Sequence, residues 1–359
     1  MIDEFLKKES KLVNIELEKF FKELNKTEKE ILFADFNNQL REFITPKDSK
    51  AKRLHPILLI AAFNGIINPL YLEEQIDEIR KVSIAVELLH SGHLIHDDLI
   101  DNDDTRRGKP TFHVQLRNEI RKTYKSIDLP EKDELIQLYG RDMSVLGGSF
   151  GYLLGLNVIR SSKFPEQLKL LAINEYSEAI DNLIRGSIIE EYMDFNNMTM
   201  SLEQYLTIAE LLRARLFEKS AKIGAILARG NIHYQIKPLS EAMLKIGQAF
   251  AIRDDILDVE KDILSKKKKF IYIVAVQNTD EDQSRRLNEI YRKQKITKNN
   301  MREVQNIFAQ TNALVIAEHF SKNLVEQAKN SLKDIYPDLN REQKVFFNEF
   351  ADFIYMRNI

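Results

Sequence analysis

The segment IRKVSIAVELLHSGHL, residues 79–94, decides the fold class. Its apolar positions Ile79, Val82, Val86 and Leu89 recur at intervals of three and four residues, and His93 continues the series. This spacing puts them on one face of an α-helix, whereas a half-buried strand would alternate every second residue. The segment therefore predicts a long helix with one buried face.

The same helical period extends to other parts of the chain. Residues 205–227 repeat it through Ala209, Leu212, Leu216, Ser220 and Ile223. The run FIYIVAV (270–276) resembles a strand, but so short an apolar run does not separate a strand from the start of a buried helix. Two polar stretches, 114–138 and 278–300, are interpreted as surface excursions or loops. The prediction is an all-α protein with long helices.

Composition excludes several classes of function. The 359 residues carry a formal net charge of −2, which is no electrostatic footprint for nucleic acid. Cysteine is absent, so disulfides, thiol catalysis and cysteine-bound metals are excluded. No apolar run approaches the ~20 residues of a transmembrane helix, and the N-terminus lacks the apolar region of a signal peptide. These features predict a cytoplasmic protein without a transmembrane segment.

The helix of residues 79–94 leads into the acidic stretch HDDLIDNDDTRRGKP, residues 96–110. Asp97 and Asp101, four residues apart, project from one face near the C-terminal end of the helix. The helix dipole is negative there and like charges four apart repel, so a bound cation would relieve both effects. Mg²⁺ takes oxygen ligands from one or two carboxylates and from substrate phosphates. Arg106 and Arg107 provide forked donors suited to phosphate, and the stretch predicts a diphosphate clamp.

A second acidic cluster repeats this arrangement. FAIRDDILDVEKD, residues 250–262, places Asp254 and Asp258 four apart at the end of another apolar helical segment, with Asp255 beside them. Two such helix ends facing each other would hold several cations around one polyphosphate.

These motifs together resemble the trans-isoprenyl diphosphate synthases, the polyprenyl synthetase family. HDDLIDNDDTRRGKPTFH is similar to the family's first aspartate-rich motif, DDxxD followed by paired arginines, and DDILD is similar to the second. KRLHPILLIAA (52–62) resembles the GKRxRP element, ELLHSGHLIHDD carries the expected histidine at His90, and FADFIYMR resembles the family's ending. The resemblance runs from about residue 50 to the end of the chain.

The resemblance implies both a fold and a reaction. The fold would be a bundle of long helices around a central deep cavity, usually in a homodimer. A single domain would span 1–359, with N-terminal helices in 1–50 and the family-like catalytic core in 51–359. Two to three Mg²⁺ ions would bind with the diphosphate of an allylic substrate. Isopentenyl diphosphate would attack the allylic cation, and a proton would then be lost.

It also implies a role for each matching residue. The metal ligands and catalytic residues would be Asp97, Asp101 and Asp254. Asp98, Asp255 and Asp258 would orient these ligands or act on the metal through water. The substrate-binding residues would be Lys52, Arg53, His55, His90, Arg106 and Arg107. Among these, Lys52, His90 and Arg107 match positions that hold isopentenyl diphosphate, and Arg106 matches a contact to the allylic diphosphate.

Several positions depart from the family pattern. A Lys-Thr pair that contacts the allylic diphosphate is replaced by Leu212 and Arg213, and a glutamine is replaced by Ala251. Leu212 lies on the apolar stripe of its helix and is interpreted as a core residue. His55 replaces an arginine. The loop after the second motif is shortened to ILSKKKKF, in which Lys266–Lys269 either restores one positive charge to the site or is a solvated run.

Three functions remain open at this point. The first is an active prenyltransferase with an unusual allylic pocket, and the second is a catalytically weak homologue that serves as a subunit of a heteromeric synthase. The third, a terpene cyclase, fits less well because Lys52, His90 and Arg107 are retained. Both aspartate motifs are intact, which favours the active enzyme.

The product is predicted to be geranylgeranyl diphosphate (C20) or longer. In relatives with shorter products, a bulky aromatic residue stands five positions before the first aspartate. That position is Gly92 here, which would leave the path of the growing chain open, and His93 is a competing stop. The alternative is that Gly92 lets a neighbouring helix approach closely.

Overall fold

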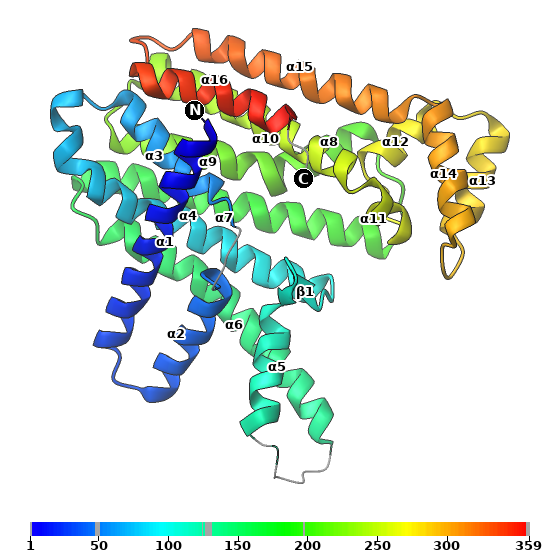
Figure 1. Ribbon diagram of the computed structural model, residues 1–359, viewed down its shortest axis with the longest axis horizontal. Coiled ribbons are helices and arrows are strands. Elements are labelled where there is room, and N and C mark those ends of the chain that lie inside the picture. The colour runs from blue at the N-terminus through cyan, green and yellow to red at the C-terminus, as the bar shows by residue number, and fades with distance from the viewer. Residues whose placement is uncertain (1, 47–50, 124, 126–130, 197, 357–359) are drawn as a thin grey trace.

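The computed structural model in Figure 1 describes residues 2–46, 51–123, 125, 131–196 and 198–356. Its α-helices are α1 Ile2–Thr27, α2 Ile31–Ile44, α3 Leu54–Ile66, α4 Leu72–Ile100, α5 Phe112–Thr123, α6 Lys132–Arg160, α7 Glu166–Phe195, α8 Leu202–Ala209, α9 Arg215–Leu227, α10 Lys237–Leu257, α11 Val259–Leu264, α12 Phe270–Gln277, α13 Glu281–Tyr291, α14 Lys298–Gln310, α15 Ala313–Lys333 and α16 Arg341–Met356. Two short strands, β1 Thr105–Arg106 and β2 Lys109–Pro110, and single turns at Pro69–Tyr71, Glu210–Ala214 and Ile232–Ile236 complete the elements.

The predicted all-α fold is confirmed. Helices α4, α6 and α7 each span 29 or 30 residues, and α4 packs along α6 while α10 packs against α15. One apolar core is built mainly from α1, α2, α4, α6 and α7, and a second from α3, α8–α10, α12 and α14–α16. None of the helices in the described ranges is long and apolar enough to span a membrane.

For two polar stretches the loop interpretation is wrong, and a third local prediction is now decided. The polar stretch 114–138 contains the greater part of α5 and the beginning of α6, and 278–300 contains α13 and the start of α14. Helices α13 and α14 begin with capping boxes at Asp280 and Thr297, signals that a reading by overall polarity misses. FIYIVAV forms α12, a helix with residues 270–275 buried. Apolar residues occupy every face of this helix because it is buried on all sides.

The helix predicted over 205–227 is present but contains a wide turn. α8 and α9 are joined by a π-helical turn, Glu210–Ala214, in which the N–H of Arg215 bonds the carbonyl of Glu210 five residues back. A turn of this kind inserts an extra residue, and π-turns inside α-helices often occur at functional sites.

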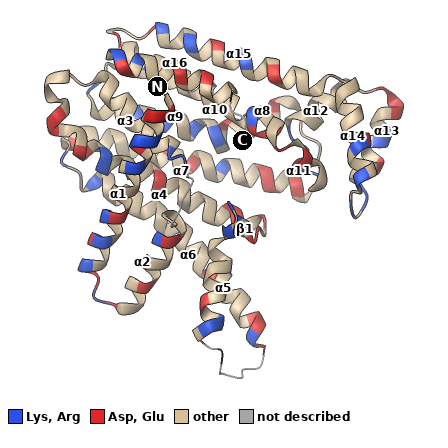
Figure 2. Cartoon of the chain, in the orientation of Figure 1, with Lys and Arg blue, Asp and Glu red and all other residues tan. Residues whose placement is uncertain are grey.

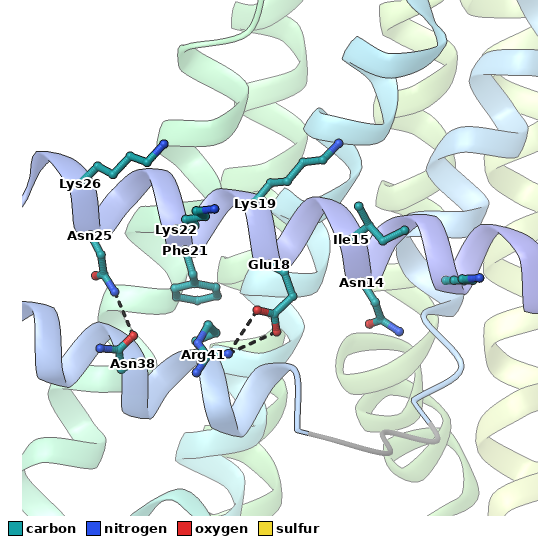
Figure 3. Close-up of a pocket in the computed structure, with 11 residues that line it drawn as sticks. Asn14, Ile15, Glu18, Lys19, Phe21, Lys22, Asn25, Lys26, Asn38 and Arg41 are labelled. Atoms are coloured by element: carbon teal, nitrogen blue, oxygen red, sulfur yellow. Dashed lines mark hydrogen bonds and ion pairs between the residues drawn. The ribbon is translucent and has the colours of Figure 1, made fainter.

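The helices α1 and α2 form a hairpin at the edge of the molecule (Figure 1). An open groove of about 780 Å³ runs along it, lined by α1 and α2 residues such as Lys11, Lys22 and Arg41. Glu18 pairs with Arg41 at 3.1 Å, while Lys19 and Lys26 point away from α2 (Figure 3). None of the predicted site residues lines this groove. Acidic and basic residues are interspersed along the outer helices in Figure 2, in keeping with the small net charge.

Candidate active site

The first aspartate motif lies at the C-terminal end of α4, as predicted. The helix ends at Ile100, and the N–H of Asp101 bonds the carbonyl of Asp97 at 2.9 Å. Asp98 is buried, and its Oδ1 accepts a hydrogen bond from Nε of Arg106 at 2.7 Å, while Nη2 of Arg106 lies 3.2 Å from Oδ2 of Asp97. Arg106 therefore holds both neighbouring carboxylates in place.

A tight hairpin that the sequence analysis did not predict presents the paired arginines. Thr105 pairs with Pro110 and Arg106 with Lys109, so Arg107 and Gly108 form a two-residue turn. Both have positive φ, 52° and 74°. Two-residue hairpin turns of type I′ require positive φ at both central positions, which glycine adopts easily. Arg106 thus contacts the aspartates, while Arg107 lines the adjacent cavity.

The second motif lies at the end of α10, with Asp258 as the capping residue. Asp255 is buried and bound by protein groups: its Oδ2 accepts hydrogen bonds from the Tyr205 hydroxyl at 2.5 Å and from the N–H of Phe270 at 3.1 Å. Burial raises the pKa of Asp255 to about 6, against the opposing effect of Lys269. Asp254 instead lines the cavity, and Asp258 is exposed.

The lysines after the second motif connect the two acidic clusters. Nζ of Lys267 lies 3.1 Å from Oδ2 of Asp101, and Nζ of Lys269 lies 3.2 Å from Oδ1 of Asp262. Both lysines are half-buried. Of the two interpretations of this run, the structure favours the one in which it brings positive charge to the site.

A cavity of about 350 Å³ lies between the two motifs. Its polar lining consists of carboxylates, cations and imidazoles: Asp97, Asp254 and Glu87; Lys52, Arg53, Arg106, Arg107 and Arg213; His55, His90 and His93. Leu212, Leu216, Phe217 and Phe250 contribute apolar surface. The structure thus brings residues from α3, α4, the hairpin, the π-turn and α10 to one cavity.

The three histidines form a neutral group in this cavity. The rings of His55 and His90 are 4.6 Å apart, centre to centre. Burial lowers the pKa of His55 and of His93 to about 4, and it lowers the pKa of His90 well below its ordinary value. His93 is 4% exposed, and its Nε2 has no hydrogen-bond partner in the described part of the chain.

Arg53 lies in the cavity wall, but its guanidinium is occupied. Its side chain is 2% exposed and pairs with Glu87 at 2.5 Å. Nη2 donates to the carbonyl of Ile44 at 2.7 Å, and Nε donates to Oδ1 of Asn14 at 2.9 Å. Every nitrogen of the fork is therefore bound by the protein. Lys52 beside it is exposed, with Nζ 5.8 Å from the ring centre of Phe353 in the C-terminal helix α16.

Gly92 faces α6, so the interpretation in which it leaves a path for the product is wrong. A Cβ atom at this position would lie 2.6 Å from the carbonyl oxygen of Gly148 and 3.1 Å from the Tyr152 ring. Gly151 lies in the same seam, close to the Gly92 backbone. Gly92 therefore permits the close approach of two helices, and the cavity wall at this level is His93.

Two charged residues near the site were missed by sequence reasoning. From the sequence, Arg213 is only a replacement for the family's threonine, and Glu190 of α7 has no predicted role. Burial raises the pKa of Glu190, and the charges acting on it include Arg213, Lys267 and Asp97. The sequence offers little signal for Glu190, because a glutamate on an amphipathic helix is usually solvated.

The carboxylates fit a hard divalent cation whose ligands come partly from the protein and partly from a substrate. Among the described residues, no three carboxylate or imidazole side chains converge to hold a metal on their own. Oδ2 of the buried Asp98, the next residue after Asp97, has no hydrogen-bond partner within the described ranges. All of the candidate ligands are oxygen atoms, and Mg²⁺ typically combines one or two carboxylates with substrate phosphates and water.

Two acidic helix ends beside a cavity lined by cations define a site for diphosphate esters handled with divalent metals. A family model, polyprenyl synthetase, matches residues 38–309. The chain belongs to the polyprenyl synthetase family, a family of prenyltransferases. The resemblance found in the motifs is thereby confirmed.

Individual relatives agree with this assignment. The chain is 29% identical to a short chain isoprenyl diphosphate synthase of Methanocaldococcus jannaschii over 85% of each chain, and 26% identical to a geranylgeranyl diphosphate synthase of Saccharolobus solfataricus over 96% of this chain and 95% of that one. The fold matches the geranylgeranyl pyrophosphate synthase of Corynebacterium glutamicum, solved with isoprenyl diphosphate and magnesium, with a TM-score of 0.84 at 20% identity over the full length of both chains.

Proposed function

We propose that this protein condenses isopentenyl diphosphate with an allylic diphosphate, in a reaction dependent on Mg²⁺, to give a trans-polyprenyl diphosphate of C20 or longer. The observation that carries the proposal is the meeting of both aspartate motifs with five cationic side chains and three imidazoles at one cavity. The names of the relatives, which include geranylgeranyl and geranylfarnesyl diphosphate synthases, support the product class.

Asp97, Asp101 and Asp254 would hold two to three Mg²⁺ ions together with the substrate diphosphate. The ions supply Lewis acidity that neutralises the leaving diphosphate. Asp98 and Asp255 position this set: the first is tied to Arg106, and the second to Tyr205 and the backbone of Phe270. Asp258, exposed at the end of α10, would act through water. These contacts fix the carboxylates before substrate arrives.

Isopentenyl diphosphate would occupy the other half of the cavity, held by Lys52, His90 and Arg107, with His55 beside His90. Arg53 acts as a positioning residue, because its ion pair with Glu87 joins α3 to α4. His93, one turn before Asp97, would form the floor that limits product length. The three imidazoles are neutral, so they donate and accept hydrogen bonds without adding fixed charge.

A homodimer is the proposed assembly. On α7, Ile184, Ile188, Tyr192 and Phe195 recur at intervals of three and four residues and are exposed, Phe195 to 90%. An apolar stripe of this kind on a helix face is typical of an interface. A heteromer is a second possibility, since the chain is 31% identical, over 58% of its length and 51% of the relative's, to a large subunit of a heterodimeric geranylgeranyl pyrophosphate synthase of Arabidopsis thaliana.

One experiment tests the proposal. The purified chain is incubated with Mg²⁺, labelled isopentenyl diphosphate and, in turn, dimethylallyl, geranyl and farnesyl diphosphate, and the products are resolved by length. A product of C20 or longer is expected with at least one primer, and none in EDTA. Absence of any elongated product with every primer would contradict the proposal and favour a catalytically weak subunit.

A further inference from the structure

The wide turn between α8 and α9 gives two adjacent residues different contacts. Leu212 is 7% exposed and packs against Gly186 of α7, where a Cβ atom would lie 2.7 Å from the Leu212 side chain. Its neighbour Arg213 lines the cavity. Leu212 also contributes apolar surface to this cavity. A packed apolar position and a charged position of the cavity wall are therefore one residue apart, within the five-residue turn that contains both.

The charges around Arg213 come from both aspartate motifs. Burial lowers the pKa of Arg213, but the carboxylates of Asp97, Glu190 and Asp254 outweigh it and raise the pKa above its ordinary value. The three carboxylates belong to α4, α7 and α10. Arg213 also contributes, after burial, to lowering the pKa of His55 and His90. Arg213 thus lines one cavity together with Asp97 and Asp254 of the two aspartate motifs and with His55 and His90.

The guanidinium of Arg213 makes few contacts with the described part of the chain. Arg53 and Arg106 each form ion pairs with carboxylates. Within the described part of the chain, Arg213 forms no ion pair, and its one hydrogen bond is a long contact of 3.5 Å from Nη1 to the carbonyl of Leu212. A cation enclosed among carboxylates that it does not contact directly is available to a ligand that bridges them.

We propose that Arg213 binds the diphosphate of the allylic substrate and stabilises it as a leaving group, which rests on the proposed function. When the allylic C–O bond breaks, its electron pair remains on the diphosphate, which gains one negative charge. The fork of Arg213 would donate parallel N–H bonds to the diphosphate oxygens. Asp97, Asp101 and Asp254 would hold the metal ions, which would supply further positive charge to the same leaving group. The charge that the family supplies as lysine at the position of Leu212 is thus supplied here by the next residue.

The test measures binding of inorganic diphosphate by calorimetry, with and without Mg²⁺, to the wild type and to Arg213→Gln. Loss of a charge-assisted contact should weaken the Mg²⁺-dependent binding about tenfold to a hundredfold. Arg215→Gln is the matched control, because Arg215 lies two residues further along the chain, at the start of α9, and pairs with Glu210 and Glu218 outside the cavity. It should bind diphosphate as the wild type does. In turnover, Arg213→Gln should lower kcat and raise KM for the allylic substrate, with KM for isopentenyl diphosphate changed less than about threefold.

Wild-type binding by Arg213→Gln, or an equal loss in Arg215→Gln, would overturn the assignment. If Arg213→Gln does not fold, Arg213→Lys keeps the charge and removes the fork, and it should bind diphosphate several-fold more weakly; unchanged binding would count against the proposal. The binding measurement needs no turnover. If the wild type binds Mg²⁺ and diphosphate through Arg213 but elongates no primer, the proposed function fails while the role of Arg213 stands.

Discussion

Gly92→Ala provides a sharp test of how α4 packs against α6. The new Cβ would lie 2.6 Å from the carbonyl oxygen of Gly148. That oxygen belongs to helix backbone and cannot rotate away, so the two helices must separate by several tenths of an ångström. Overpacking of this kind costs about 1–3 kcal/mol. Replacing glycine by alanine within a helix returns about 1 kcal/mol. Because the obstacle is rigid, we expect the upper part of the range and a net loss of about 1–2 kcal/mol in the free energy of unfolding.

Urea denaturation at fixed protein concentration measures this loss. Gly65→Ala in α3 is the matched control, since its Cβ would meet side-chain atoms of Gln343 and Leu339 at 3.2 Å and no backbone. It should be close to neutral. The products of Gly92→Ala should keep the wild-type length. A Gly92→Ala protein as stable as the wild type would show that α4 and α6 are not in close contact at residue 92. A shorter product would show that residue 92 faces the growing chain.

Three further predictions concern the site. Asp97→Asn and Asp254→Asn should each lower turnover by orders of magnitude, because charge neutralisation during ionisation is the main contribution to the barrier. Exposed Asp181→Asn on α7 is the control. Near-normal turnover in Asp97→Asn or Asp254→Asn would refute the metal assignment. Leu212→Lys should lower the free energy of unfolding by a few kcal/mol, because it buries a charge, whereas Leu212→Met should be nearly neutral. Urea denaturation midpoints measure both effects. Tighter binding of the allylic substrate by a stable Leu212→Lys protein would instead show that residue 212 contacts the diphosphate. Burial lowers the pKa of His55 from 6.5 to about 4. Between these pH values the unfolded chain binds a proton that the folded protein does not, so the free energy of unfolding should fall as pH drops from 6.5 towards 4. His55→Asn should weaken this pH dependence, and an unchanged dependence would contradict the assignment to His55.

The helix periods and the two aspartate motifs could be predicted from sequence because each is a local pattern. Helix ends carrying carboxylates four apart are visible in a short segment, and the structure places both where the pattern indicated. The position of Gly92 could not be predicted in the same way. A helix such as α4 is buried on several sides, and the period does not reveal which side faces a cavity and which faces another helix. Arg53 is a related case, because its partner Glu87 lies on another helix and its motif also suits a substrate ligand.

The replacement at Leu212 shows why loss of a motif residue does not establish loss of a function. An alignment compares positions in sequence, and it assigns the missing lysine to residue 212, which the protein uses for packing against Gly186. The π-turn contacts α7 and α10, which are distant in sequence and leave no local signature near residue 212. The cavity responds to charge at a point in space, which Arg213 can supply from the adjacent position, as Lys267 supplies it to Asp101 from a shortened loop. Both changes conserve positive charge around the aspartates while altering the residues that carry it. An allylic pocket that looks depleted in sequence is therefore compatible with an electrostatically complete site.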